Sequence, residues 1–448
     1  MVSLFETMVT ADGRRPWRVE MNRTSPSYME KRMTVRVPVV LLILYASLAR
    51  PAATAATEVV LCEADLRIMS GFVASPDAEH LAWMEENEGR KRVVLDGATG
   101  PYYESVSDIV FSEDGDHMAY VVGTSRTPVP GVNYAIVFDG VLGESYEQVS
   151  VPKMDLHGRM LAYVAETRNA PVTLVVNGSP RRPGDTIVGG SLVLSREGGR
   201  FAFTVKQKDL YHLVTDAGLR GSYKSLVPSR VEFSPGGEHL SFAIYAVEPA
   251  FFMDEEMFDS CYGMLGPVYD SVGKSLGYAL RYQDVWRVTI RHPAKTIQFE
   301  TTDNVSDLML SPSGEHFAYL RTRPLGGKVV MLDTVPVGEY DRVEGLTFSP
   351  DGKHLAFAAG EGSRWRVVYR GDTTGLYESV RHLVVSPSGG HWACWVGKEG
   401  RWRGVVDGIK GRAYDATLTR IVFDNEHQLH YIARRRNTYY RVNVSLDE

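Results

Sequence analysis

The chain has 448 residues, of which 44% are hydrophobic and 23% charged, and its formal net charge is −6. These values are ordinary for globular proteins and exclude the disordered and fibrous classes. The 42 glycines, 22 prolines and 23 tyrosines favour many short strands joined by turns over a helical bundle.

The first 55 residues differ from the rest of the chain. Residues 1–28 are polar, and we interpret them as an extension that precedes the true start of translation. From residue 29 a basic stretch precedes an apolar run over Val37–Ala49 and an A-x-A pattern at Ala53–Ala55, which predicts a secretory signal peptide over residues 29–55. A membrane anchor is the alternative, but 13 apolar residues make only about 20 Å of helix, against a hydrocarbon core of about 30 Å. We therefore expect a periplasmic or secreted protein with no stable membrane span after signal cleavage.

The remaining domain, residues 56–448, is acidic. The leader holds eight basic and four acidic residues, so 41 basic and 51 acidic residues remain, a net charge of about −10. Such a surface repels nucleic acid, and we expect no nucleic-acid partner. The run Arg434–Arg436 is a dense basic cluster, and we interpret it as a solvated strand edge rather than a phosphate site.

Three cysteines, Cys62, Cys261 and Cys394, cannot build a disulfide framework, and none belongs to a C-x-x-C pair. Cys394 falls in an apolar strand, so we expect a buried thiol there. Whether Cys62 pairs with Cys261 is left open by the sequence.

A nine-residue phrase returns along the domain at intervals of 36 to 43 residues. Its clearest copy, Ser349–Phe357, reads SPDGKHLAF. In each copy an apolar strand ends before the first residue, a turn rich in Pro and Gly follows, and a second apolar strand begins, which is the pattern of a β-hairpin. The ten copies begin at Ser75, Ser112, Asp155, Ser195, Ser234, Asp270, Ser311, Ser349, Ser386 and Asp424.

Most units continue with two more strands. A phrase ending in Asp-Gly or Asn-Gly, as in Val93–Gly97, turns a third strand into a fourth. A glycine followed closely by a tyrosine, as in Gly375 and Tyr377, marks the fourth strand. Four short strands in about 39 residues make one blade of a β-propeller.

The stretch Phe348–Phe357 matches the repeat F-S-P-D-G-K-x-L-A-F of the TolB-like, WD-repeat-like β-propeller family, and the resemblance extends over residues 58–448. The resemblance implies an all-β propeller and, by analogy, envelope lipoproteins or peptidoglycan-associated proteins as partners. Similar repeats occur in the propeller halves of prolyl-oligopeptidase-like hydrolases, so the resemblance indicates the fold and not the activity.

Ten units predict ten blades, and the chain ends predict how the blades close. Leu66–Gly71 occupies the place of a fourth strand before the first full repeat, and the last repeat supplies three strands, through Tyr440–Val444. We expect the N-terminal strand to complete the C-terminal blade, because this covers both edges. A single closed ring is favoured, with two five-bladed rings broken near residue 250 as the alternative.

Six histidines share one slot at the start of the second strand. Packed sheets lie about 10 Å apart, so neighbouring blades cannot share a zinc ion whose bonds to nitrogen are about 2.0–2.1 Å long. We interpret the slot as a structural position repeated by duplication, and we expect neither a metal site nor a cofactor. The six are His80, His117, His239, His316, His354 and His391.

Two further patterns have a functional and a structural interpretation. Gly273–Gly277, GKSLG, satisfies the G-x-S-x-G pattern of a nucleophile elbow, but its serine falls in the histidine slot and no α/β-hydrolase domain follows. Aromatic residues recur at the start of the third strand, where packing between blades is favoured over ligand stacking. These residues are Trp286, Trp365, Trp402, Tyr134, Tyr211 and Tyr440.

Residues 245–269 depart most from the repeat. Apolar residues with acids between them predict a short amphipathic helix or a rim loop, where binding usually resides, and a degenerate blade is the alternative. The acids would contact a cation or a basic partner. The candidate partner-binding residues are Phe251, Phe252, Asp254, Glu255 and Glu256.

Because repeats fill the domain, the sequence predicts an exported scaffold that binds a protein, a peptide or a cell-envelope component without catalysis. The alternative is a hydrolase or lyase whose catalytic groups meet in the central channel from several blades. No residue is assigned a catalytic role.

Overall fold

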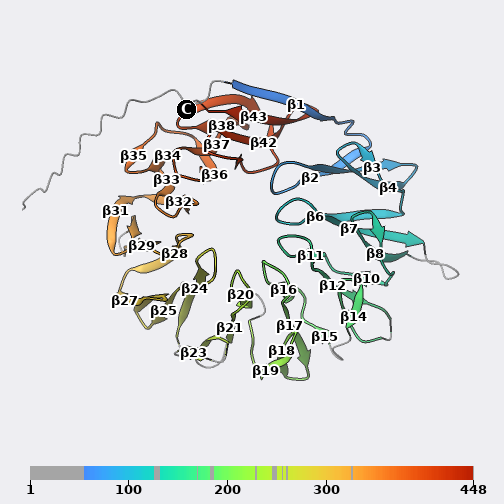
Figure 1. Ribbon diagram of the computed structural model, residues 1–448, viewed down its shortest axis with the longest axis horizontal. Coiled ribbons are helices and arrows are strands. Elements are labelled where there is room, and N and C mark those ends of the chain that lie inside the picture. The colour runs from blue at the N-terminus through green and yellow to red at the C-terminus, as the bar shows by residue number, and fades with distance from the viewer. Residues whose placement is uncertain are drawn as a thin grey trace, which may run out of the picture. The chain divides into compact units, whose positions relative to one another are not determined.

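The computed structural model describes residues 55–125, 132–168, 170–181, 186–227, 230–244, 250–254, 256–258, 261–323 and 326–446. The extension and nearly all of the signal peptide lie outside the described residues, so their assignment stays a prediction. From residue 55 onwards, ten antiparallel sheets stand around one axis as a single ring of ten blades (Figure 1). The two-ring alternative is therefore wrong.

Each blade is one sheet whose strands follow one another in the chain, apart from the last blade. Blades one to five contain β2 (Met69–Ala74), β3 (Leu81–Asn87), β4 (Arg90–Leu95) and β5 (Ala98–Thr99); β6 (Ser105–Phe111), β7 (Met118–Ser125), β8 (Val132–Phe138) and β9 (Val141–Leu142); β10 (Gln148–Val149), β11 (Lys153–Met154), β12 (Leu161–Glu166), β13 (Thr173–Val176) and β14 (Ser179–Arg181); β15 (Thr186–Ile187), β16 (Val193–Leu194), β17 (Phe201–Gln207), β18 (Leu210–Thr215) and β19 (Gly218–Tyr223); and β20 (Glu232–Phe233), β21 (Leu240–Ile244), β22 (Ala250–Met253) and β23 (Glu256–Phe258). Blades six to ten contain β24 (Gly263–Tyr269), β25 (Leu276–Tyr282), β26 (Val285–His292) and β27 (Lys295–Thr301); β28 (Asn304–Leu310), β29 (Phe317–Thr322), β30 (Lys328–Leu332) and β31 (Val335–Tyr340); β32 (Arg342–Phe348), β33 (Leu355–Glu361), β34 (Arg364–Tyr369) and β35 (Asp372–Thr373); β36 (Ser379–Val385), β37 (Trp392–Lys398), β38 (Arg401–Val406) and β39 (Ile409–Tyr414); and β40 (Ala416–Thr417), β41 (Val422–Phe423), β42 (Gln428–Arg435), β43 (Thr438–Ser445) and β1 (Ala55–Glu63).

Within a blade the first strand lies next to the axis and the fourth lies at the outer edge (Figure 1). In blades three, four and ten the inner strand is broken into two short pieces that pair with the same second strand. The described residues contain no α-helix, and so none that is long and apolar enough to cross a bilayer.

The ring closes between the two ends of the described chain. β1 pairs antiparallel with β43, from Ala55 opposite Ser445 to Glu63 opposite Thr438, and is the fourth strand of blade ten. The prediction that an N-terminal strand completes the last blade is confirmed. The sequence assigns that role to Leu66–Gly71, however, and this was wrong by several residues, because Met69 already begins the inner strand of blade one.

The core lies between neighbouring blades. Second strands are buried on both faces, so they are apolar without alternation, as in Leu81–Trp83 and Trp392–Val396. A typical cluster joins Val93 of blade one to Tyr120 and Val137 of blade two. Each fully buried apolar side chain of this size stabilises the fold by roughly 1.5–3 kcal/mol.

The turns between first and second strands stack on one another around the ring. Gly115 has a φ of 92°, and a Cβ there would lie 2.3 Å from Oδ1 of Asp77 in the preceding turn. Glycine is needed at such a position because it accepts both the positive φ and the close approach. Backbone hydrogen bonds add to the stacking, since the N–H of Leu156 donates to the carbonyl of Arg196 at 2.7 Å.

The cysteines and tryptophans are structural. Cys62, Cys261 and Cys394 are all free and buried, so the pairing left open by the sequence does not form. Burial raises the pKa of the Cys394 thiol. Trp286 and Trp365 are buried in clusters between blades, as predicted from their recurrence.

Candidate functional site

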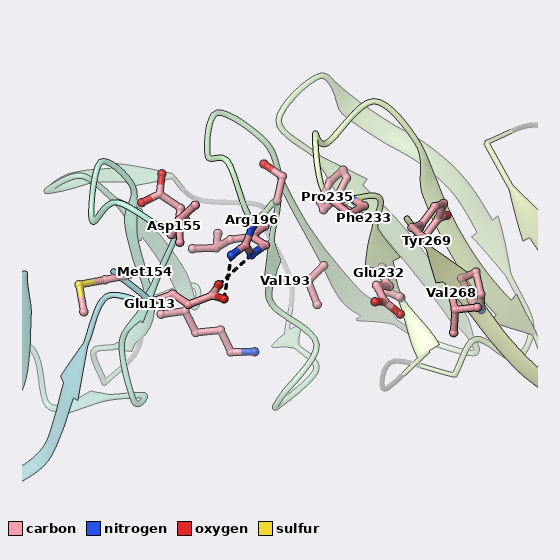
Figure 2. A pocket seen from close by; sticks show the side chains of 16 residues that line it. Glu113, Met154, Asp155, Val193, Arg196, Glu232, Phe233, Pro235, Val268 and Tyr269 are labelled. Atoms are coloured by element: carbon pink, nitrogen blue, oxygen red, sulfur yellow. Dashed lines mark hydrogen bonds and ion pairs between the residues drawn. The ribbon is translucent and has the colours of Figure 1, made fainter. Parts of the chain in front are cut away.

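The inner wall of the ring changes along the chain. The inner strands of blades six to nine, β24, β28, β32 and β36, have seven residues each, whereas β11, β16 and β20 of blades three to five have two. A cavity of about 720 Å³ opens where the short strands stand side by side. We call this cavity the inner-wall pocket, and Figure 2 shows the side chains that line it.

The lining of the inner-wall pocket is largely apolar. Met154, Val193, Phe233 and Val268 come from the inner strands of four successive blades, three to six. In Figure 2 they follow one another from left to right across the pocket. A surface of this kind offers the hydrophobic contact area that most ligand sites have.

An ion pair between two turns borders the pocket. Nε and Nη2 of Arg196, in the turn of blade four, each lie 3.0 Å from a carboxylate oxygen of Glu113 in the turn of blade two (dashed in Figure 2). The hydrogen bond to Glu113 raises the pKa of Arg196. Both side chains are about half exposed, so water screens the pair and its contribution to stability is small.

Two charged residues depart from the repeat inside the pocket. Register places Lys153 of blade three opposite Ala162, and Glu232 of blade five opposite Ser241. In the other eight blades the same inner-strand slot holds Val or Met, or in one case Thr; these residues are Val73, Val110, Val193, Val268, Met309, Thr347, Val384 and Val422. The pocket thus carries a cation and an anion on the two sides of Val193.

The environment of each charge differs. Nζ of Lys153 donates to the carbonyl oxygen of Leu192 at 2.7 Å, which holds the ammonium toward blade four. Glu232 is accessible to water but stands in a concave wall, where the surrounding protein atoms raise the pKa of its carboxyl more than the charge of Arg230 lowers it. Burial raises the pKa of the neighbouring Tyr269 to about 12. Glu232 can therefore accept a positive ligand group or hold a proton.

The histidine slot forms pairs within single blades. In five of its six members, Nδ1 of the histidine lies 2.6–2.9 Å from one carboxylate oxygen of an aspartate in the turn between the third and fourth strands. The other carboxylate oxygen accepts a hydrogen bond from the backbone N–H of the residue after the histidine. These contacts fasten two turns of one sheet, which agrees with the structural interpretation. The pairs are His80–Asp96, His117–Asp139, His239–Asp254, His316–Asp333 and His391–Asp407.

In one blade a substitution changes the aspartate of this pair, and in another blade it changes the histidine. His354 faces Arg370 instead of an aspartate, and Nη2 of Arg370 lies 3.0 Å from its Nε2. Where Arg200 replaces the histidine, its Nε binds Asp216 at 2.8 Å. The joint presence of a histidine and an aspartate 15 to 22 residues later in one unit is a signal that sequence reasoning could have used and did not.

Serine, histidine and aspartate recur together without forming catalytic triads. Oγ of Ser75 accepts a hydrogen bond of 2.9 Å from the backbone N–H of His80, and not from its imidazole ring. Ser75 is also fully buried. The serine of GKSLG, Ser275, is 1% exposed, and its backbone N–H donates to Asp270. A strand follows it and not a helix, so the rejection of a nucleophile elbow is confirmed.

The residues predicted to bind a partner lie in a regular hairpin. Phe251 and Phe252 belong to β22 and Glu256 to β23, so the segment is a blade and neither the short helix nor the rim loop. Phe252 stacks on Phe242 in the core, with ring centroids 5.0 Å apart. Asp254 pairs with His239, and Glu256 with Arg291 of the next blade; Glu255 lies outside the described residues.

Comparisons with known proteins bear on the fold alone. No protein-family model and no curated protein matches the chain. Among solved structures, a eukaryotic initiation factor is 9% identical over 77% of this chain and 87% of its own, with a TM-score of 0.45. TolB from Acinetobacter baumannii is 12% identical over 74% and 80%, with a TM-score of 0.28, and a prolyl endopeptidase is 12% identical over 68% and 54%, with a TM-score of 0.31. At these identities and scores the likenesses carry no argument about function.

Proposed function

We propose that this chain is an exported, non-catalytic propeller of TolB-like type, periplasmic or secreted, that binds a short peptide segment of a partner protein in the inner-wall pocket. One observation carries the proposal: Lys153 and Glu232 place opposite charges in a slot that is uncharged in the other eight blades. Both line one cavity together with Val193. A duplicated position that becomes charged only where it borders a cavity is poorly explained by packing between blades.

The size and chemistry of the pocket favour a peptide. Its volume of about 720 Å³ lies within the range of roughly 300–1,000 Å³ that small-ligand sites occupy. An apolar middle with a cation on one side and an anion on the other matches a peptide whose apolar side chain is flanked by an acidic and a basic residue. Charge complementarity of this kind fixes the direction in which a peptide lies.

A library of short displayed peptides tests the proposal. The wild-type chain should select peptides that combine one apolar residue with one acid and one base in a preferred order. Lys153→Glu and Glu232→Lys should each weaken the selected peptides at least about tenfold, which is about 1.4 kcal/mol. The double variant Lys153→Glu/Glu232→Lys should select peptides with the reverse order of charges.

A matched control separates the pocket from general charge effects. Asp284 has a carboxylate that is 97% exposed in a turn of blade six, away from the inner strands, so Asp284→Lys should leave peptide affinity unchanged. Equal affinity of the wild-type chain and Glu232→Lys for the selected peptides would refute binding in this pocket. Circular dichroism of every variant shows whether the propeller is intact.

The hairpin over β22 and β23 stays a second prediction for partner binding. Its exposed acid Glu256 already pairs with Arg291 at 3.2 Å, so a basic partner would have to displace that arginine. Glu256→Ser removes the acid without deleting a strand. Loss of partner capture in this variant, with the pocket variants unaffected, would move the binding surface from the pocket to the hairpin.

A catalytic role is favoured by one feature, the raised pKa of Glu232, because catalytic acids and bases often have perturbed pKa values. A hydrolase acting from the channel predicts that Glu232→Gln retains peptide binding and loses turnover. A scaffold predicts no turnover of the selected peptides by either protein.

A further inference from the structure

The seam between blade ten and blade one contains the largest single departure from the repeat. At the position where His430 pairs with Val422, the other nine blades carry a small residue. These small residues are Ala82, Ala119, Ala162, Ala202, Ser241, Gly277, Ala318, Ala356 and Ala393. His430 is nevertheless 2% exposed, so an imidazole is buried where the repeat has room for a methyl group.

Hydrogen bonding fixes the tautomer of this imidazole. Nε2 lies 2.7 Å from the carbonyl oxygen of Asp77, in the first turn of blade one. A carbonyl can only accept, so Nε2 carries the proton and donates. In the neutral ring, Nδ1 then carries the lone pair.

Nδ1 faces a second electron-rich group. Oδ1 of Asp424 lies 2.7 Å from it, yet the geometry is not that of a hydrogen bond, and Nδ1 has no hydrogen-bond partner among the described residues. A lone pair and a carboxylate oxygen in contact repel each other unless a positive charge lies near both. The buried Nδ1 of His430 therefore faces a position that favours a positive charge.

A third ligand comes from the other end of the chain. Glu79, in the first turn of blade one, has Oε1 3.5 Å from Nε2 of His430, whereas Asp424 lies next to Nδ1. One donor atom each from Glu79, Asp424 and His430 lie within 4.8 Å of one another. Arg441 also donates to Glu79, so two carboxylates and one guanidinium leave the cluster with an excess negative charge.

We propose that Glu79, Asp424 and His430 bind a divalent metal ion of the zinc class, which fastens blade ten to blade one. One imidazole nitrogen and two carboxylate oxygens form a ligand set that zinc accepts, with water completing the coordination. Magnesium and calcium prefer oxygen ligands alone and should bind more weakly. Because the ligands come from both ends of the chain, binding is possible only when the ring is closed. This site is independent of the inner-wall pocket.

Calorimetry with zinc ion alone tests the site on the full chain after treatment with a chelator. The wild-type chain should bind one zinc ion, and its melting temperature should rise when the free zinc exceeds the dissociation constant about 100-fold. His430→Ala installs the residue that most other blades carry in this slot, so it should fold, and it should weaken zinc binding at least about tenfold. Asp424→Asn should weaken it similarly, and it keeps the test valid if His430→Ala does not fold.

His316→Asn is the matched control, because it removes an imidazole next to Asp333 in a regular blade and leaves the seam intact. It should bind zinc as the wild-type chain does. Equal zinc affinity of the wild-type chain and His430→Ala overturns the proposal, and so does an equal rise in melting temperature with magnesium. A seam that is stabilised by acid but not by zinc would show that a proton takes the place proposed for the metal, which also overturns it.

Discussion

Two kinds of junction hold the ring together, and they use different chemistry. Between regular blades, a small residue, a stacked turn and an apolar cluster repeat with little change, as around Val137 and Val93. At the seam between blade ten and blade one, an apolar cluster that includes Trp83 and Tyr439 is also present, and charged and polar groups are added to it. Blade ten itself differs from the other blades, because its outer strand β1 is no copy of the repeat.

Glu58 shows the charged contacts that β1 makes within blade ten and with blade nine. It lies on β1, its side chain is 13% exposed, and it accepts two hydrogen bonds of 3.0 Å from Arg435, one of 3.0 Å from Arg412 and one of 2.7 Å from the hydroxyl of Tyr414. Burial by itself would raise the pKa of Glu58, but these donors and the two positive charges outweigh it and hold the pKa below its usual value. The run Arg434–Arg436 therefore contributes to ring closure at Arg435. Its interpretation as a solvated strand edge is wrong for Arg434 and Arg435, because β42 lies between β40 and β43 and both side chains are half-buried.

The largest expected effect tests the regular junction. Phe357 is 1% exposed and packs edge-on against Tyr340 at 5.5 Å. Phe357→Ala should lower the free energy of unfolding by about 3–5 kcal/mol, because it leaves a cavity between two blades. Urea titration measures the change, which should be the same at pH 4 and pH 7. Phe357→Leu is the control and should cost much less; a strong pH dependence would contradict apolar packing as the main contribution.

A smaller effect is expected where β1 completes blade ten. Glu58→Gln removes the charge that Arg435 and Arg412 share and should lower the free energy of unfolding by about 1–3 kcal/mol at pH 7. Because the pKa of Glu58 is lowered in the folded state, its contribution is complete above the unfolded pKa and is lost as the pH falls through the folded value. Glu63→Gln changes an exposed acid on the same strand and is the control. A greater loss in Glu58→Gln than in Phe357→Ala would reverse the comparison.

Local chemistry explains why the fold could be predicted. The hairpin of Ser349–Phe357 depends on a turn sequence and on two flanking apolar strands, all of which are contiguous in the chain, and β32 and β33 form where this pattern places them. Ten such copies with near-constant spacing determine ten blades. The sequence predicted correctly that an N-terminal strand completes the last blade, but it placed that strand at the wrong residues, because residues 55–63 follow no repeat.

The sites could be predicted only in part, because they depend on register between units. Lys153, Glu232 and His430 stand out once each is aligned with its slot in the other blades, and the alignment requires the pairing of first and second strands. The partners of Glu58 could not be found in this way, since Arg435 lies at the far end of the chain and belongs to no shared motif. The hairpin chosen from composition, around Phe252, packs that one ring against the core, and its role in partner binding stays a prediction.

The contact between blades nine and ten combines features of the two kinds of junction, because a charged side chain takes the place of a stacked turn. Glu426 replaces the stacked glycine turn with a carboxylate that reaches back to blade nine. It accepts the backbone N–H groups of Ser388 and Gly390 at 3.0 and 2.7 Å and the hydroxyl of Ser386 at 2.7 Å. Burial opposes ionisation, but these donors prevail and lower the pKa of Glu426 from 4.5 to about 2.

Glu426→Gln should therefore show the smallest and the most pH-dependent effect. A carboxyl with a lowered folded-state pKa contributes fully above its unfolded value, near 4.5, and loses that contribution as the pH falls through about 2. Allowing for partial exposure, we expect the wild-type chain to exceed the variant by about 1–2 kcal/mol at pH 7, and the difference to close toward pH 2. Urea titrations between pH 2 and pH 7 measure it, with Glu315→Gln, an exposed acid in the corresponding turn of blade seven, as the control. A difference that stays constant with pH would mean that the shape of the side chain, and not its charge, joins blade ten to blade nine.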